Sequence, residues 1–285
     1  MIYISTGCIS GDSIRDRVEL LAQEGFLNIE LTGGTKLYDN YLEDLINLKE
    51  KYHINYLVHN YFPPPEESFV LNLGSKDKRI IEQSLSLCKK AIYDASLLGS
   101  DYYSFHAGFY FDPKIKELGE VLDDRVLASA TETVDIFQKN VKTLEDFSRP
   151  YGIKLFIENN VVNLGSFKSF NNIPPAMLLS FDEFLKLKSQ FSFNLLLDVA
   201  HLKVSVNSLG LNFSHELSNL INCSNYLHLS DNSGLRDENK QITIDSDLFS
   251  ILRTKNLSNK VITLEVYESI DKIRSTYNLV QSLLK

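Results

Sequence analysis

The sequence predicts an α/β fold, a single (β/α)8 TIM barrel that spans residues 1–285, and two observations support it. Short apolar runs typical of buried strands recur along the whole chain, and segments with helical periodicity separate them. Strands that alternate with helices imply a parallel sheet, and eight such units suggest that the sheet closes into a barrel. A doubly wound open sheet is the structural alternative.

The expected elements follow one another in a regular order. Helices are expected between the strands, for example at residues 13–25, 41–52 and 76–99. In the last of these segments apolar residues recur at helical spacing, and Ser75 is the expected N-cap. The expected strands are IYIST (2–6), NIELTG (28–33), INYLVHN (54–60), YYSFHAG (102–108), KLFIENN (154–160), NLLLDVAH (194–201), NYLHLSDN (225–232) and VITLEVYE (261–268).

The composition and net charge of the chain indicate which classes of protein it can belong to. With 44% hydrophobic and 23% charged residues, the 285-residue chain has an ordinary globular composition and enough apolar material for a large core. Its formal net charge of -8 argues weakly against non-specific binding to nucleic acid or to an acidic membrane. Three distant cysteines, Cys8, Cys88 and Cys223, form no closed disulfide set, and no apolar run approaches bilayer length. We therefore expect a cytoplasmic protein with reduced thiols.

Ionisable residues stand at the C-terminal ends of the expected strands. In a parallel barrel these ends share one face, where such barrels keep their active sites, so the residues are expected to meet in one pocket. Six strands carry an acid or a histidine there, and Glu30 on the second strand is a seventh candidate. The six residues are His59, His106, Glu158, Asp198, His228 and Glu265.

The acids among them predict a divalent metal ion. Glu158, Asp198 and Glu265 would repel one another in a poorly solvated site unless a cation balanced their charge. With His228 they form an oxygen-rich set suited to Mn²⁺, Mg²⁺ or Co²⁺, with Zn²⁺ as an alternative.

The other histidines divide into two groups. His59 and His106 supply nitrogen ligands for a second ion, in which case Zn²⁺ becomes more attractive. A single histidine or acid at a strand end is more often a hydrogen-bond partner or a helix cap than a ligand, so it is their number on one face that favours a site. His53 and His215 lie before a strand or in a connection, and we interpret both as structural or solvent-exposed.

Seven short segments of the chain are specific only when they are taken together. They are LVHN, LNLGS, LLGSDYYSFHAG, FIENN, LLLDVAH, HLSDNSG and LEVYE. Together they resemble the xylose isomerase-like TIM-barrel superfamily, which joins sugar isomerases and epimerases with apurinic endonuclease IV. The resemblance extends from about Glu30 to Glu265, which is nearly the whole chain.

The resemblance to the ketose epimerases implies a metal-dependent sugar isomerase or epimerase. It implies that Glu158 and Glu265 are catalytic residues, which exchange protons with the sugar carbon through a metal-stabilised enediolate. It also implies that His201 contacts substrate oxygens, and Arg236 is a candidate contact for an anionic group. The metal ligands implied by the resemblance are Glu158, Asp198, His228 and Glu265.

The alternative is a zinc-dependent phosphodiester hydrolase of the apurinic endonuclease IV type, which uses three zinc ions. Its second site matches the ligand set above. Its third site needs His201 and an Asp-x-His element, where Asp237 matches but Asn239 stands in place of the histidine. An amide oxygen is a poorer zinc ligand than an imidazole. The residues that match its first site are His59, His106 and Glu158.

The loop after His59 also departs from the endonuclease pattern. Where the endonuclease has a short DNA-inserting turn, this chain has NYFPPPEESFV (60–70), whose three prolines and two glutamates form a stiff, acidic lip. We therefore expect a small-molecule carbohydrate substrate, with neither nucleic acid nor membrane as a partner. The sequence leaves open which sugar is bound, whether the enzyme is an isomerase or an epimerase, and whether it forms a homo-oligomer.

Overall fold

The computed structural model describes residues 1–117, 120–122 and 125–284. Within these residues eight parallel strands close into a barrel in chain order. The last strand pairs with the first, with Ile2 beside Ile262 and Ile4 beside Leu264, so the sheet has no edge. The (β/α)8 prediction is confirmed and the open sheet is excluded. The strands are β1 (Ile2–Ser5), β2 (Asn28–Leu31), β3 (Asn55–His59), β4 (Tyr102–His106), β5 (Lys154–Glu158), β6 (Asn194–Asp198), β7 (Tyr226–Leu229) and β8 (Val261–Leu264).

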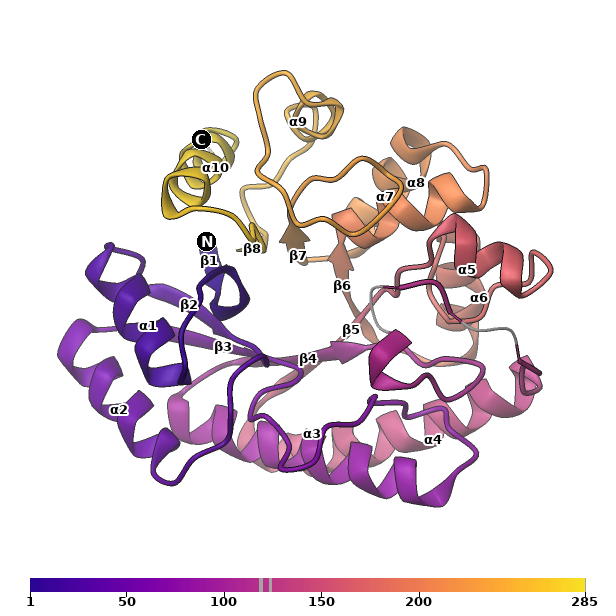
Figure 1. Cartoon of the computed structure of the whole chain (residues 1–285), viewed down its shortest axis with the longest axis horizontal. Helices are drawn as coiled ribbons and strands as arrows, with labels where there is room; N and C mark the ends of the chain where they lie inside the picture. The colour runs from indigo at the N-terminus through magenta and orange to yellow at the C-terminus, as the bar shows by residue number, and fades with distance from the viewer. Residues whose placement is uncertain (118–119, 123–124, 285) are drawn as a thin grey trace.

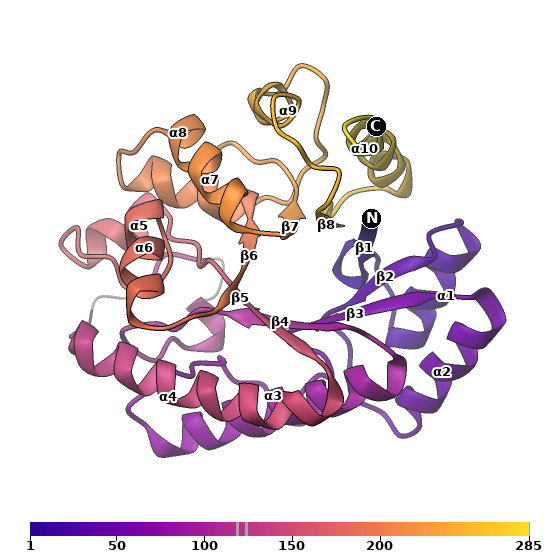
Figure 2. The same cartoon turned by 180° about the vertical axis from the view of Figure 1, so that it is seen from behind.

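Helices surround the strands on all sides (Figure 1), and Figure 2 shows the same ring from behind. Among the described helices, none is both long and apolar enough to cross a bilayer. The α-helices are α1 (Ile14–Gln23), α2 (Tyr41–Tyr52), α3 (Lys78–Leu98), α4 (Ala130–Ser148), α5 (Leu164–Ser169), α6 (Phe181–Gln190), α7 (Val199–Ser208), α8 (Phe213–Leu220), α9 (Asp247–Leu252) and α10 (Ile270–Ser282); short 3-10 helices lie at Thr6–Cys8, Ile115–Glu117, Arg149–Tyr151 and Ile221–Cys223.

The strands end earlier than the sequence predicts. The strand expected at 194–201 stops at Asp198, whose Oδ1 accepts a hydrogen bond from His201 N at 2.7 Å and so caps α7. A carboxylate that bonds a backbone amide three residues later starts a helix and thereby ends the strand. The residues beyond the strands therefore belong to the loops and helix starts that build the mouth of the barrel.

An apolar cluster inside the barrel lies directly beneath this polar end. Side chains two residues apart on a strand face the same side, so the residue two positions after each member of the cluster also faces the interior. Phe156 is followed in this way by Glu158, and Tyr226 by His228. The polar side chains thus rest on a layer that excludes water. The cluster consists of Tyr3, Leu57, Phe156, Leu196 and Tyr226.

The N-cap of α3 is Asp77, and the sequence-based assignment to Ser75 is wrong. Asp77 Oδ1 accepts a hydrogen bond from Arg79 N at 2.8 Å. The Ser75 hydroxyl instead accepts a bond from Asp77 N and donates to Asp112 Oδ2, each at 2.9 Å. Ser75 therefore holds the loop that precedes the helix, and the chain becomes helical only after Asp77.

Asp77→Ala should lower the free energy of unfolding by about 1 kcal/mol, because the amide of Arg79 loses its acceptor. Asp77→Asn keeps an acceptor oxygen and should remain close to the wild type. Urea titrations followed by circular dichroism measure both values. An equal loss in the two variants would mean that the effect does not arise from capping.

Candidate metal centre

The six residues that the sequence singles out lie at, or within one residue of, the C-terminal ends of six barrel strands. β3, β4, β5 and β6 each end on one of them, β7 ends one residue after His228, and Glu265 directly follows β8. All six are buried except His106, whose side chain is 28% exposed. The structure thus brings them together at one end of the barrel. The four strand-terminal residues are His59, His106, Glu158 and Asp198.

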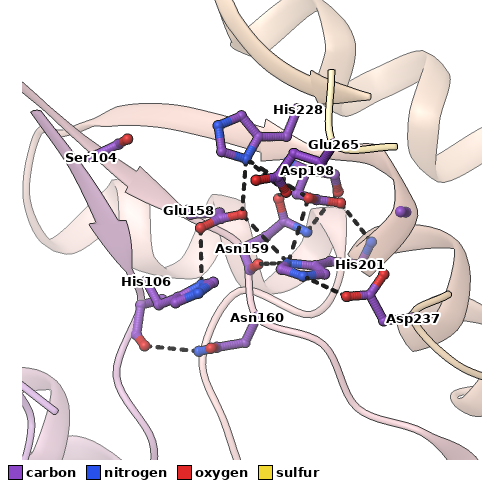
Figure 3. A network of polar contacts seen from close by, with 12 residues as sticks. Ser104, His106, Glu158, Asn159, Asn160, Asp198, His201, His228, Asp237 and Glu265 are labelled. Atoms are coloured by element: carbon purple, nitrogen blue, oxygen red, sulfur yellow. Dashed lines mark hydrogen bonds and ion pairs between the residues drawn. The ribbon is translucent and has the colours of Figure 1, made fainter. Parts of the chain in front are cut away.

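Glu158 lies at the centre of the cluster (Figure 3). Its Oε2 is 3.0 Å from His106 Nδ1 and 3.3 Å from His59 Nε2. Its Oε1 is 3.4 Å from His228 Nδ1 and 3.6 Å from His201 Nδ1. Burial acts to raise the pKa of this carboxyl, but His106 and His59 outweigh it and hold the pKa well below its ordinary value. Glu158 is therefore an anion surrounded by imidazoles.

His228 directs its two ring nitrogens to opposite partners. Nε2 lies 3.0 Å from Glu30 Oε1, and Thr263 Oγ1 donates to Glu30 Oε2 at 3.1 Å. Nδ1 lies 3.4 Å from both Glu158 Oε1 and Glu265 Oε2. When the Nε2 proton is directed to Glu30, the Nδ1 lone pair faces the other carboxylates, as in metal-binding histidines. Glu30 therefore lies behind His228, away from the cluster that its Nδ1 faces.

Asp198 is held by the neighbouring strand. The side-chain amide of Asn159 accepts a bond from Asp198 N at 2.7 Å and donates to Asp198 O at 3.0 Å. His201, in the first turn of α7, has Nδ1 at 3.0 Å from Asn159 O and Nε2 at 3.3 Å from Asp237 Oδ2. Burial raises the pKa of Asp198 to about 7, although His201 acts against it. The carboxyl is thus poised between its charged and neutral forms near neutral pH.

His59 completes the other side of the cluster. Its Nδ1 is 2.9 Å from Ser104 Oγ, which leaves Nε2 facing Glu158. Burial lowers the pKa of His59 to about 3. The ring is therefore neutral, the form in which histidine binds metal ions.

A divalent cation fits these donors. Glu158 Oε2, His106 Nδ1 and His228 Nδ1 are buried, and their imidazole–carboxylate contacts, at 3.0 Å for His106 and 3.4 Å for His228, do not have hydrogen-bond geometry. Buried polar atoms without a hydrogen bond are rare in folded proteins. Carboxylate oxygens and imidazole nitrogens together suit Mn²⁺, Co²⁺ or Zn²⁺. Among the described residues, donor atoms lie within 4.8 Å of one another in three groups. The groups are His59, His106 and Glu158; Glu158, Asp198 and His228; and Glu30, His228 and Glu265.

Two further candidates from the sequence lie at the rim of this cluster. Arg236 is exposed, and together with Asp237 it lines a cavity of about 220 Å³ that reaches His106 and His201. Asp237 contacts His201 directly, whereas the side chain of Arg236 is exposed. Both positions are compatible with contacts to a bound substrate.

Three other residues from the sequence analysis lie outside the cluster. Asn239 Oδ1 accepts a hydrogen bond from Ser230 Oγ at 2.9 Å, so its side chain is engaged with the segment after β7. His53 ends α2 in a left-handed conformation. His215 has a side chain that is 72% exposed. The interpretation of both histidines as structural or exposed agrees with these positions.

Sequence reasoning missed the residues that support the cluster. Ser104 stands two positions before His106 on β4, and Thr263 stands two positions before Glu265, which directly follows β8, so strand periodicity could have placed them on the interior face. Asn159 carries no such signal, because its contacts with Asp198 exist only where β5 lies beside β6.

Comparisons with known proteins agree on the fold. A family model described as xylose isomerase-like TIM barrel matches residues 18–282. No curated protein sequence matches the chain.

Several solved structures have the same fold. A D-tagatose 3-epimerase-like protein has a TM-score of 0.74 and 19% identity, over 99% of this chain and 96% of that chain. The IOLI protein with a binding zinc atom has a TM-score of 0.67 and 15% identity, over 99% and 97%. Endonuclease IV from Thermus thermophilus has a TM-score of 0.61 and 15% identity, over 99% and 98%. At these identities the likeness establishes the fold.

Glu30→Gln should weaken the binding of Mn²⁺ or Zn²⁺ by about 10- to 100-fold, because His228 loses the carboxylate that orients its ring. Isothermal titration calorimetry on the full chain measures the affinity. Glu43→Gln, which alters an exposed glutamate on α2, is the matched control and should have no effect. Wild-type affinity in Glu30→Gln would show that Glu30 does not act through His228.

Cation binding should release protons. Burial raises the pKa of Asp198 to about 7, and Glu30 and Glu265 raise that of His228 despite its burial. Both pKa values lie above those of the unfolded chain, so the stability they contribute to the metal-free protein is present in acid. The contribution of Asp198 is lost as the pH rises through about 7, and that of His228 is lost as the pH rises through its own raised pKa. A bound cation needs both groups unprotonated, so its affinity should rise over the same range.

Calorimetry in buffers of different ionisation enthalpy counts the released protons. Titrations at about pH 6 and about pH 8 should give more protons released and weaker binding at the lower pH. Binding that is independent of both buffer and pH would contradict the assignment of protonated Asp198 and His228 in the metal-free protein.

Proposed function

Since the chain belongs to the xylose isomerase-like TIM barrel family, we propose that it is a divalent-metal-dependent isomerase or epimerase of a sugar or sugar derivative. One observation carries the proposal: Glu158 and Glu265, from different strands, each approach His228 Nδ1 to 3.4 Å. Two carboxylates therefore flank the place where a cation fits. The shared fold with a D-tagatose 3-epimerase-like protein supports the same interpretation.

The reaction would be proton transfer beside a carbonyl. A bound divalent cation would supply Lewis-acid polarisation of the sugar carbonyl and its neighbouring hydroxyl. Glu158 or Glu265 removes the proton from the adjacent carbon, and the same or the other carboxylate returns it. Return by the same residue to the neighbouring carbon, with the hydroxyl proton passing to the former carbonyl oxygen, gives isomerisation, and its return to the original carbon gives retention. Return to the original carbon from the opposite face gives epimerisation.

The charges of the two glutamates suit this role. Each pKa is lowered although burial acts to raise it, for Glu158 through His106 and His59 and for Glu265 through His228. Both carboxylates are thus unprotonated and able to accept a proton.

His201 would hold a substrate hydroxyl. Asp198 and Asp237 raise its pKa above the ordinary value although burial acts to lower it, so both ring nitrogens carry protons. Nδ1 faces Asn159 O, and Nε2 lies beside Asp237 at the cavity. A sugar oxygen that enters this cavity can therefore accept a hydrogen bond from Nε2.

One observation favours a second candidate, a zinc-dependent phosphodiester hydrolase of the endonuclease IV type. The group of His59, His106 and Glu158 matches the first zinc site expected for such an enzyme. We rank it second because Asn239 replaces a zinc-binding histidine and is bonded elsewhere. The proline-rich loop 60–70 also stands at the mouth, where a DNA strand would approach.

Glu265→Gln should lower turnover by about 100-fold or more and leave much of the substrate affinity intact. The amide keeps an oxygen for the cation but cannot carry the proton. In deuterated water, the wild type loaded with Mn²⁺ should place deuterium on the carbon beside the carbonyl of a ketose that it accepts. Mass spectrometry of a panel of ketoses measures the exchange.

Glu132→Gln, an exposed carboxylate on α4, is the control and should turn over like the wild type. A hydrolase leaves carbon-bound protons untouched, because metal-bound water attacks phosphorus. Cleavage of DNA with an abasic site, without exchange in any sugar of the panel, would make the endonuclease assignment the better one.

A further inference from the structure

A larger cavity, of about 640 Å³, opens beside the metal centre. Its wall is formed by residues that follow β1, β2, β3 and β8, so it lies at the same end of the barrel. Tyr61 lines both this cavity and the smaller one that reaches His106 and His201, so the two adjoin. The volume is in the range of small-molecule sites. We call it the Arg17 cavity.

Arg17, on α1, is the only charged side chain that lines the Arg17 cavity among the described residues. Its guanidinium donates to three backbone carbonyls, those of Gly11 at 3.2 Å, Thr6 at 3.3 Å and Gly34 at 2.7 Å. Within the described chain it forms no ion pair with a carboxylate. Burial lowers its pKa, as expected for a partly desolvated charge that no anion neutralises. Two of its five N–H groups remain for a ligand.

Two further donors in the same wall have no partner. Asn60 is 3% exposed, and its Oδ1 accepts a bond from His106 N at 3.1 Å, but its Nδ2 makes no hydrogen bond. The hydroxyl oxygen of Thr35 is likewise buried without a partner. Leaving buried donors unsatisfied is costly unless a ligand completes them. The wall therefore holds one cation and two buried polar groups without a partner, and no carboxylate among its described residues.

We propose that the Arg17 cavity binds an anionic group, a phosphate monoester or a carboxylate, on a sugar derivative whose carbonyl end lies at the metal centre. This inference rests on the proposed function and names its substrate class. A guanidinium recognises phosphate and carboxylate oxygens with two parallel hydrogen bonds. An anion accepts hydrogen bonds without donating any, which matches the N–H groups of Arg17 that no backbone carbonyl accepts.

The charge of the surroundings agrees with an anionic ligand. The two glutamates of the loop, Glu66 and Glu67, do not line the Arg17 cavity; they line an adjoining hollow together with Lys90, and the two share Pro64, Pro65 and Phe69. The chain as a whole has a net charge of -8, so an anion needs a local cation to bind. Arg17 supplies that cation at the mouth of the barrel.

Arg17 also ties together the loops after β1 and β2 through its three carbonyl contacts. A purely structural arginine would affect neutral and anionic ligands alike when it is replaced. An anion-binding arginine affects only the anionic ones. The two roles are therefore distinguished by comparing the affinities of neutral and anionic ligands in the same variant.

The test measures binding to the full chain loaded with Mn²⁺, by calorimetry. One arm compares neutral ketoses with their phosphate esters, D-fructose with D-fructose 6-phosphate and D-ribulose with D-ribulose 5-phosphate. A second arm uses 5-keto-D-gluconate, which carries a carboxylate, and separates the two kinds of anion. A third arm uses inorganic sulfate, which reports on the cavity without any sugar chemistry.

In the wild type we expect an anionic ligand to bind about 10-fold or more tightly than its neutral counterpart, as charge-assisted hydrogen bonds allow. Arg17→Gln should abolish this preference and the binding of sulfate. Arg17→Lys should keep part of the preference, since the charge remains but the planar fork is lost. Arg15→Gln, on the same helix with a side chain that is 53% exposed, is the matched control and should change nothing.

Thermal melts check that each variant is folded. If Arg17→Gln does not fold, the same affinities are measured in Thr35→Val and Arg17→Lys. Each of these variants should reduce the preference for the anionic ligand over the neutral one. Equal affinity for neutral and anionic ligands in the wild type, or an equal loss for both in Arg17→Gln, would overturn the inference. If no sugar shows solvent exchange but sulfate binding depends on Arg17, the proposed function fails while the anion site stands.

Discussion

Four carboxylates are buried together at one end of this barrel, three of them on strands and the fourth directly after β8, and the rest of the site depends on how their charge is balanced. Glu30, Glu158, Asp198 and Glu265 are each at most 7% exposed. Like charges in a poorly solvated site cannot all ionise unless positive charge lies among them. His228, between Glu30 and Glu265, supplies part of that charge, because these carboxylates raise its pKa. A divalent cation would supply the rest.

The supporting residues keep this arrangement in place. The apolar cluster beneath it excludes water, which strengthens every electrostatic contact above. Asn159 holds the backbone of Asp198, and Thr263 holds the carboxylate behind His228. The mouth is thereby divided into an acidic centre and, beside it, a cavity whose charged residue is Arg17. A ligand with a carbonyl at one end and an anion at the other matches this division of charge.

Local sequence patterns predicted the wrong end for one strand and the wrong start for one helix. Asp198 and His201 stand in a run that is apolar enough to extend the strand, but a capping bond between them starts α7 instead. Serine is a residue type that often caps helices, yet the hydroxyl of Ser75 donates a hydrogen bond to Asp112. Both errors arise because a short polar side chain can satisfy several backbone groups, and only the path of the chain decides which one.

The barrel and its cluster of strand-end residues were predictable from the sequence. Apolar periodicity is a local property, and parallel closure brings the C-terminal strand ends together whatever the loops do. Tertiary structure alone decided that Glu30 faces His228 and that the Arg17 guanidinium reaches Gly34. These contacts join segments far apart in the chain. Their geometry depends on the register of the closed sheet and on how helices pack against it, which no local pattern specifies.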